Sequence, residues 1–68
     1  MNENLMKEIV ENIIEAANEI RHKQMPDLIE QGQLIAYAES LSIIRDALSG
    51  QDLAAVGLDF DIDEKYLA

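Results

Sequence analysis

Cysteine is absent from this sequence, and histidine occurs only once. Without thiols the chain forms neither a disulfide nor a thiolate zinc site, and one imidazole is too few for a histidine-rich metal site. The chain has 68 residues, and a domain of that size is marginally stable alone. Small domains compensate with disulfides, a structural metal or oligomerisation. Oligomerisation remains, and we expect no cofactor.

Basic residues are also scarce. The sequence has 5 lysines and arginines against 14 aspartates and glutamates, a net charge of −9 at pH 7. Nucleic-acid binding depends on Lys and Arg side chains that neutralise phosphates. We therefore expect no nucleic acid as partner, and any charged partner to be a basic protein. Apolar residues make up 49% of the chain, which is too many for a disordered acidic segment.

Long hydrophobic runs are missing. The longest uninterrupted apolar run, residues 34–38, is far short of the roughly 20 residues that a membrane-spanning helix needs. The first residues lack the basic stretch and apolar run of a secretory signal. These features predict a cytoplasmic protein that does not contact a membrane.

Two segments of helical length, residues 3–24 and 26–49, dominate the sequence. In the first, apolar residues recur with a period of 3.6 and cover about half of the helix circumference. Pro26 ends or kinks a helix because it lacks an N–H group, and it is well tolerated in a first turn. Gly32 is the other candidate for the turn between the helices. We favour the break at 24–26.

The second segment carries two apolar ridges. The first ridge alternates spacings of three and four residues and consists of Leu34, Tyr37, Leu41, Ile44 and Leu48. The second ridge lies beside it and consists of Ile29, Ala36, Ile43 and Ala47. With Leu28, Ile35 and Ala38, which fall outside these ridges, the first half of this segment is apolar nearly all round, which is typical of a helix buried on more than one side.

The last part of the chain differs in kind. Residues 52–56 predict a short helical turn, and residues 58–63 alternate strictly between apolar and acidic, which is the period of a strand. No partner strand exists, so we expect an extended acidic tail, 58–68, that lies across the helices with Leu58, Phe60 and Ile62 inward. A final turn at 64–67, capped by Asp63, is compatible with this arrangement.

The predicted fold class is all-α, with one helical-hairpin domain over residues 1–68. Two antiparallel helices are followed by a short C-terminal turn and the extended tail. Faces this wide exceed what two helices can bury against each other, so we expect two hairpins to pair into a homodimeric four-helix bundle. The candidate residues for the dimer core are Ile13, Leu34, Ile35, Tyr37, Leu41, Ile44 and Leu48.

Two groups of acidic residues are candidate partner surfaces. One group forms a row at helical spacing opposite the apolar face of the first helix: Glu8, Glu11, Glu15 and Glu19. The row either keeps the protein in solution or docks a basic protein. The other group is Asp59, Asp61 and Asp63, which matches the start of a calcium loop. Glu64 then stands where such a loop needs glycine, so we expect solvated acids rather than a calcium site.

Catalytic and metal-binding residues are not expected. Glu19 and His22 have the Glu-x-x-His spacing of di-metal bundles, but both lie opposite the apolar stripe and therefore point to water. A nucleophile needs an adjacent base held by a third group, and no such set is apparent. We therefore predict that the protein is not an enzyme.

Residues 32–48, followed by 57–63, resemble small acidic proteins of unassigned function from Gram-positive bacteria and their phages or mobile elements. The similarity covers the second helix and the tail, about half of the chain. It implies no activity, and it assigns no functional residue.

The leading hypothesis is a non-enzymatic, homodimeric interaction module whose tail or acidic face contacts another protein. An acidic inhibitor or antidote of a basic, nucleic-acid-handling protein is the alternative, and it would act through the glutamate row. A di-metal carboxylate bundle is a third alternative that depends on Glu19 and His22 alone.

Overall fold

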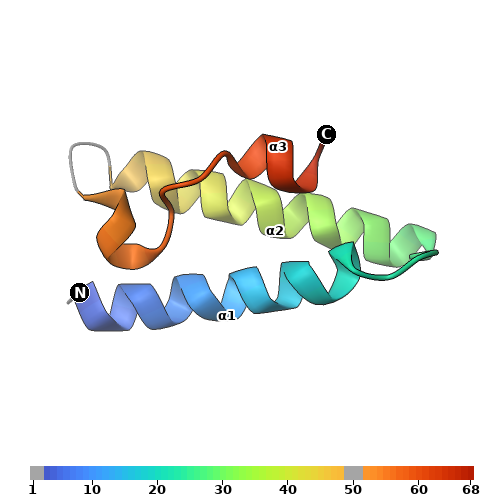
Figure 1. Ribbon diagram of the computed structural model, residues 1–68, viewed down its shortest axis with the longest axis horizontal. Coiled ribbons are helices and arrows are strands. Elements are labelled where there is room, and N and C mark those ends of the chain that lie inside the picture. The colour runs from blue at the N-terminus through green and yellow to red at the C-terminus, as the bar shows by residue number, and fades with distance from the viewer. Residues whose placement is uncertain (1–2, 49–51) are drawn as a thin grey trace.

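The computed structural model describes residues 3–48 and 52–68 of the chain. Two long helices, α1 (Glu3–Arg21) and α2 (Leu28–Ala47), form an antiparallel hairpin (Figure 1). A 3₁₀ turn, η1 (Leu53–Val56), and a short helix, α3 (Ile62–Tyr66), follow. Every regular element among the described residues is helical, so the predicted all-α hairpin is confirmed.

The turn between the long helices lies at residues 22–27, near Pro26 rather than at Gly32. Asp27 caps α2: its carboxylate accepts the Glu30 N–H at 2.7 Å, and the Glu30 carboxylate accepts the Asp27 N–H at 3.1 Å. This reciprocal capping box satisfies two N–H groups that the first helical turn leaves free. It starts α2 at Leu28, two residues later than expected, and α1 ends at Arg21 rather than at residue 24.

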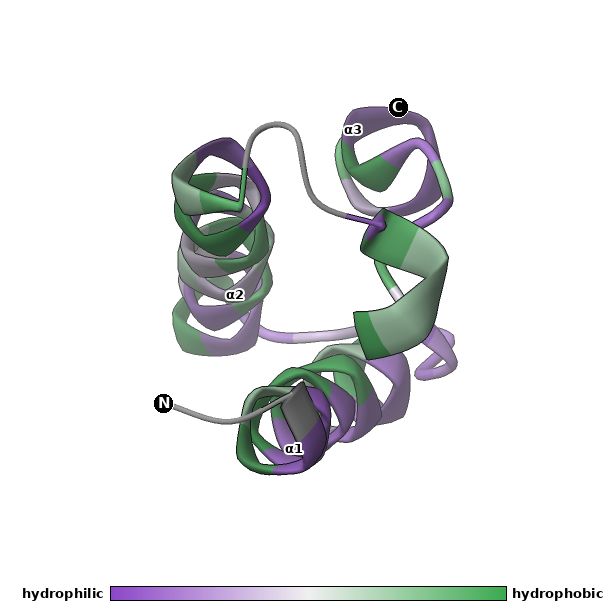
Figure 2. Ribbon diagram, turned by 90° about the vertical axis from the view of Figure 1, so that its left-hand side faces the viewer, coloured by the Kyte–Doolittle hydropathy of each residue, from purple (hydrophilic) through white to green (hydrophobic). Residues whose placement is uncertain are grey.

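The C-terminal segment runs back along one side of the hairpin, and η1 contacts α1 while α3 contacts α2 (Figures 1 and 2). Gly57 ends η1 with a φ of 84°, a left-handed conformation that glycine adopts without strain. The expected extended tail is interrupted by α3. Its N-cap is Asp61 rather than Asp63, because the Asp61 carboxylate accepts the Glu64 N–H at 3.1 Å. Residue 49, the expected end of the second helix, lies outside the described residues.

The core lies between α1, α2 and this returning segment. Leu58 and Ile62 of the segment are fully buried and Phe60 packs against them, as the alternating pattern predicted. Val56 of η1 and Tyr66 of α3 are buried as well, and the two long helices contribute Val10, Ala17, Ile20, Ala38 and Leu41. The segment therefore covers one side of the hairpin. Figure 2 shows no described element on the opposite side.

The molecule is elongated. It extends over 36 × 20 × 15 Å and has a radius of gyration of 12.2 Å, against about 11 Å for a compact domain of this length. No helix in the described part of the chain has an apolar stretch long enough to cross a membrane.

Candidate functional site

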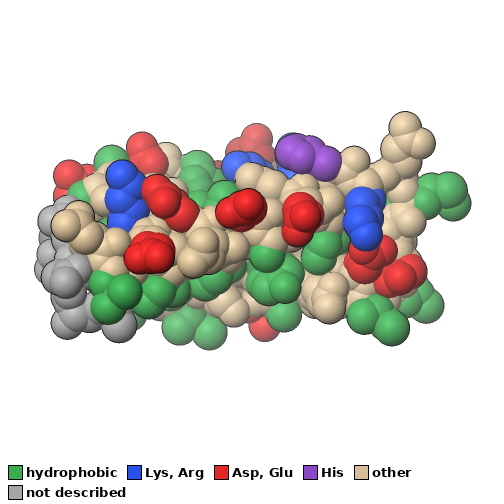
Figure 3. All heavy atoms as spheres, turned by 90° about the horizontal axis from the view of Figure 1, so that it is seen from below, with side chains coloured by type: hydrophobic (Ala, Val, Ile, Leu, Met, Phe, Trp, Pro, Cys, Tyr) green, Lys and Arg blue, Asp and Glu red, His purple; other side chains and the backbone are tan. Residues whose placement is uncertain are grey.

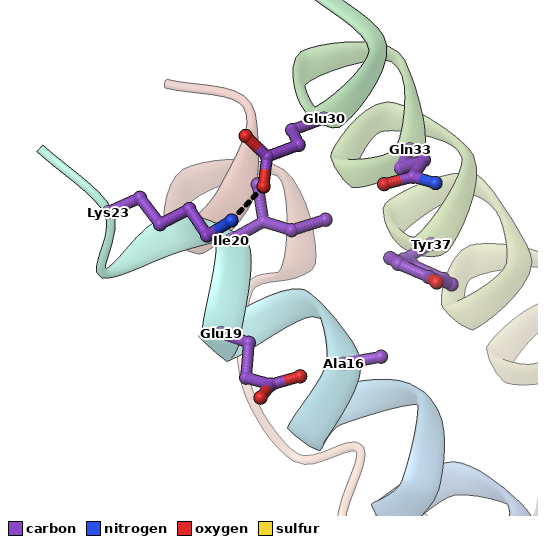
Figure 4. A pocket seen from close by; sticks show the side chains of 7 residues that line it. All are labelled: Ala16, Glu19, Ile20, Lys23, Glu30, Gln33 and Tyr37. Atoms are coloured by element: carbon purple, nitrogen blue, oxygen red, sulfur yellow. Dashed lines mark hydrogen bonds and ion pairs between the residues drawn. The ribbon is translucent and has the colours of Figure 1, made fainter. Parts of the chain in front are cut away.

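An open groove of about 310 Å³ lies between α1 and α2, near the turn that joins them (Figure 4). Ala16 and Glu19 of α1 face Gln33 and Tyr37 of α2 across it. Ile20, Lys23 and Glu30 complete its lining. Ala16 has the smallest side chain in this lining and lies across the groove from Tyr37.

An ion pair crosses the turn at one end of the groove. The Lys23 ammonium donates a hydrogen bond to the Glu30 carboxylate, whose other oxygen belongs to the capping box. This hydrogen bond and the charge of Glu30 raise the pKa of Lys23 above its ordinary value. The same bond, together with the Asp27 N–H, lowers the pKa of Glu30. Lys23 is exposed to water, so the pair orients the turn and contributes little to stability.

The groove has the chemistry of a packing surface. Its described lining residues supply an aromatic ring, aliphatic groups, an amide and the Lys23–Glu30 pair, and none of them is a serine, cysteine or histidine. Glu19 lines the groove and is exposed, and His22 is exposed just beyond the end of α1. Across residues 3–48 and 52–68, no three His, Cys, Asp or Glu side chains gather closely enough to hold a metal ion.

A second hollow of about 310 Å³ lies where the tail meets the end of α1. The Arg21 guanidinium donates to the Lys65 carbonyl oxygen at 2.8 Å. The Lys65 ammonium lies 4.9 Å from the centre of the Phe60 ring, within cation–π distance. The Arg21 hydrogen bond fastens α3 to the end of α1, whereas the Lys65–Phe60 contact lies within the C-terminal segment itself.

The predicted dimer-core residues occupy different depths in the chain. Leu41 is fully buried, so its side chain already packs in the core of its own chain. Ile35 is 48% exposed. The others are partly buried and pack against the core of the same chain: Ile13, Leu34, Tyr37, Ile44 and Leu48. The structure thus places most of this set inside one chain and leaves Ile35 on its surface.

A different row of apolar side chains lies on the surface of α2. Ile29 is 74% exposed, Ile43 is 68% exposed, and Ala36 between them is exposed. We call Ile29, Ala36 and Ile43 the outer ridge. The sequence contains its signal, a spacing of seven residues, but does not indicate which of the two ridges on this helix the tail covers. The outer ridge was therefore not among the predicted dimer-core residues.

The acidic groups are all on the surface. Glu8, Glu11, Glu15 and Glu19 are exposed on α1, and Figure 3 shows acidic side chains along this face, with apolar side chains gathered along the lower edge of the view. Lys7 pairs with Glu11 at 3.9 Å. In the tail Asp59, Asp61 and Asp63 are exposed, and Asp61 serves as the cap of α3.

Comparisons of the chain with protein-family models, curated proteins and solved structures find no significant match.

Proposed function

We propose that the protein is a non-enzymatic interaction module that acts as a homodimer, in which two α1–α2 hairpins pair into a four-helix bundle. The observation that carries this proposal is the exposure of large apolar side chains on α2, where Leu28 is 84%, Ile29 74% and Ile43 68% exposed. Monomeric proteins seldom expose apolar residues as a continuous patch, and such patches mark interaction sites. Pairing would bury them, and the tail or the acidic face would remain available to another protein.

The shape of the chain supports the same proposal. The returning segment covers one side of the hairpin, and the long helices have only each other on the remaining side. A second hairpin placed there would give each helix the two neighbours that it has in a four-helix bundle.

Sedimentation equilibrium at micromolar concentrations tests the assembly. We expect a dimer. Because each copy carries a charge of −9, repulsion opposes pairing, so the dimer should become tighter as salt screens the charges. A folded monomer at every concentration and salt level would contradict the proposal.

A second candidate function is an acidic inhibitor or antidote of a basic, nucleic-acid-handling protein. The observation in its favour is the glutamate row on α1, whose four members are all exposed. Rows of one sign raise the association rate with oppositely charged proteins and lose that effect in salt. Salt thus separates the two candidates, since it weakens this interaction and strengthens self-pairing.

The row is tested by changing Glu8, Glu11, Glu15 and Glu19 together to glutamine. The control removes exposed acidic charges outside both candidate partner surfaces, at Asp46 and Glu64. Both variants and the original chain are used to capture proteins from a nuclease-treated lysate of the native host. Loss of a basic protein in the first variant alone would support the candidate, whereas equal capture by all three chains would remove the row from consideration.

A further inference from the structure

The outer ridge forms a straight line on α2. Its members, Ile29, Ala36 and Ile43, are seven residues apart, and seven residues fall about 20° short of two full turns. Over the fourteen residues from Ile29 to Ile43 the line is about 21 Å long at 1.5 Å per residue. It therefore offers a contact about two thirds as long as α2, which has 20 residues.

The centre of this line is open to close approach by another helix. Ala36 has the smallest side chain of the three, and Gly32 lies one turn before it. A Cβ atom added at Gly32 would meet nothing within 4 Å, so this glycine makes no close contact within its own chain. Glycine costs about 1 kcal/mol in a helix interior, and no described part of the chain benefits from it.

The outer ridge has the same order of side chains, Ile–Ala–Ile, whichever way it is followed along α2. A homodimer with a two-fold axis presents the same patch from both copies, so its contact must be self-complementary. With the axis at Ala36, an antiparallel pair of α2 helices places Ile29 of one copy against Ile43 of the other, twice. On the flanks, Gln33 lies beside the second copy's Ser40, and Glu39 lies beside its Gly32. No two like charges are opposed.

The exposed area of the chain favours a second copy as the occupant. The chain exposes 4786 Å², whereas a monomer of 7.6 kDa exposes about 4,300 Å². The excess of about 500 Å² is a large part of the roughly 800 Å² that each member of a stable complex buries. The outer ridge itself carries no charge, so it gives a basic partner nothing to pair with.

We propose that the dimer forms through an antiparallel α2–α2 contact centred on Ala36, with Ile29 of each copy packed against Ile43 of the other. This inference rests on the proposed homodimer and specifies its geometry. The tail of each copy then lies away from the contact and remains available to a further partner.

Disulfide trapping tests the position of the axis, because the chain has no cysteine of its own. Helices that pack 8–10 Å apart, each with a Cα radius of about 2.3 Å, bring facing Cα atoms to about 3.4–5.4 Å. The upper part of that interval overlaps the Cα–Cα range of about 4.4–6.8 Å that a disulfide spans. Ala36→Cys should therefore form a covalent dimer under mild oxidation. Glu15→Cys, on the outer face of α1, is the control and should stay uncrosslinked.

Sedimentation of both cysteine variants under reducing conditions tests the homodimer separately from the α2–α2 contact. If both variants are dimers and only Ala36→Cys crosslinks, the inference is supported. If both are dimers and Ala36→Cys fails to crosslink, or Glu15→Cys crosslinks equally well, the α2–α2 contact is wrong while the homodimer stands. If both are monomers, the homodimer itself is wrong.

A charge exchange tests the antiparallel direction. Ile43→Lys places two unpaired charges in the contact and should weaken the dimer at least tenfold, with helicity unchanged because Ile43 is 68% exposed in one chain. Adding Ile29→Glu to the same chain places the new carboxylate of each copy opposite the new ammonium of the other, at both ends of the contact. This pairing should recover much of the loss. Both new charges suit the helix dipole.

The matched control for the charge exchange is Leu67→Lys, an exposed apolar residue of the tail at 46% exposure. It should leave the dimer unchanged. Recovery in the double variant supports the antiparallel contact. A double variant as weak as Ile43→Lys, or a Leu67→Lys variant that weakens the dimer equally, would overturn it.

Discussion

The two long helices have almost the same length, 19 residues in α1 and 20 in α2, yet their outward faces differ. Both present a buried face to the core, through Val10 of α1 and Leu41 of α2. The opposite face of α1 carries the glutamate row, whereas the opposite face of α2 carries the outer ridge. Figure 2 shows hydrophobic colouring on one side of α1 and around much of α2. A helix that is apolar on two sides is typical of one with neighbours on two sides.

This difference arises because the short tail covers only one side of the hairpin and leaves the outward face of α2 exposed. The tail carries enough apolar residues, Leu58 and Ile62 above all, to complete one core. It is too short to cover both sides of α2. The glutamates of α1 need no cover, because they are solvated, and the outer ridge remains for a second chain.

The largest expected effect separates the two faces of α2. Leu41→Ala removes a fully buried side chain and should lower the free energy of unfolding by about 2–5 kcal/mol. Ile43→Ala is the control and should change it by less than about 0.5 kcal/mol, provided that the protein is dilute enough to be monomeric. Urea unfolding followed by circular dichroism gives both values. Equal losses would mean that α2 has no distinction between inner and outer faces.

The start of α2 depends on its cap. Asp27→Ala removes the carboxylate that accepts the Glu30 N–H and should cost about 1 kcal/mol. Asp59→Ala, an exposed aspartate of the tail, is the control and should cost less than about 0.5 kcal/mol. Thermal unfolding of the two variants provides the comparison. A cost that is the same at both positions would show that α2 begins without help from its capping box.

The tail is attached to α1 by one partly buried hydrogen bond. The Tyr66 hydroxyl donates to the Asn18 side-chain oxygen at 2.8 Å, so Tyr66→Phe should cost about 1 kcal/mol. Tyr37→Phe, in the groove between the helices, is the control. Amide hydrogen exchange in α3 should accelerate in the Tyr66 variant and remain unchanged in the Tyr37 variant.

The same tyrosine gives the fold a dependence on alkaline pH. Burial raises the pKa of Tyr66 above its ordinary value of 10.0, and the charge of Arg21 opposes this in part. The unfolded chain therefore ionises first, so this contribution to stability is full below pH 10 and is lost as the pH rises through the folded pKa. Stability measured against pH should fall less steeply above pH 10 in Tyr66→Phe than in the original chain. Equal slopes would contradict this prediction.

The smallest effect is expected on the outer face of α1. Glu15→Gln removes a charge that lies four residues from both Glu11 and Glu19, and like charges at that spacing repel by a few tenths of a kcal/mol. Stability should therefore stay unchanged or rise slightly. Glu30→Gln, which loses an ion pair and half of the capping box, should lower it. A clear loss of stability at Glu15 would show that the row has a structural role.

Much of the fold could be predicted from local patterns. The 3.6-residue period gave the two long helices, and Pro26 placed the break between them because its missing N–H group opposes a continuous helix. The alternation of Leu58, Phe60 and Ile62 indicated which side chains of the tail face inward. The helix in the tail was placed two residues too late, as a turn at 64–67 capped by Asp63, because a period of two and one short helical turn place Ile62 inward equally well. Asp61 decided between them by capping α3.

The sequence by itself determined that the chain is all-α, that it forms a hairpin and that it carries more apolar surface than two helices can bury. Hydrophobic periodicity, proline and charge are local properties of the sequence, and their effects do not depend on how the helices pack. Only the tertiary structure decided which of the two apolar ridges of α2 is covered, because that depends on the side of the hairpin along which the tail returns. In the folded chain Leu41 packs in one core with residues of α1 and of the returning tail, whereas Ile29 and Ile43 are left in water.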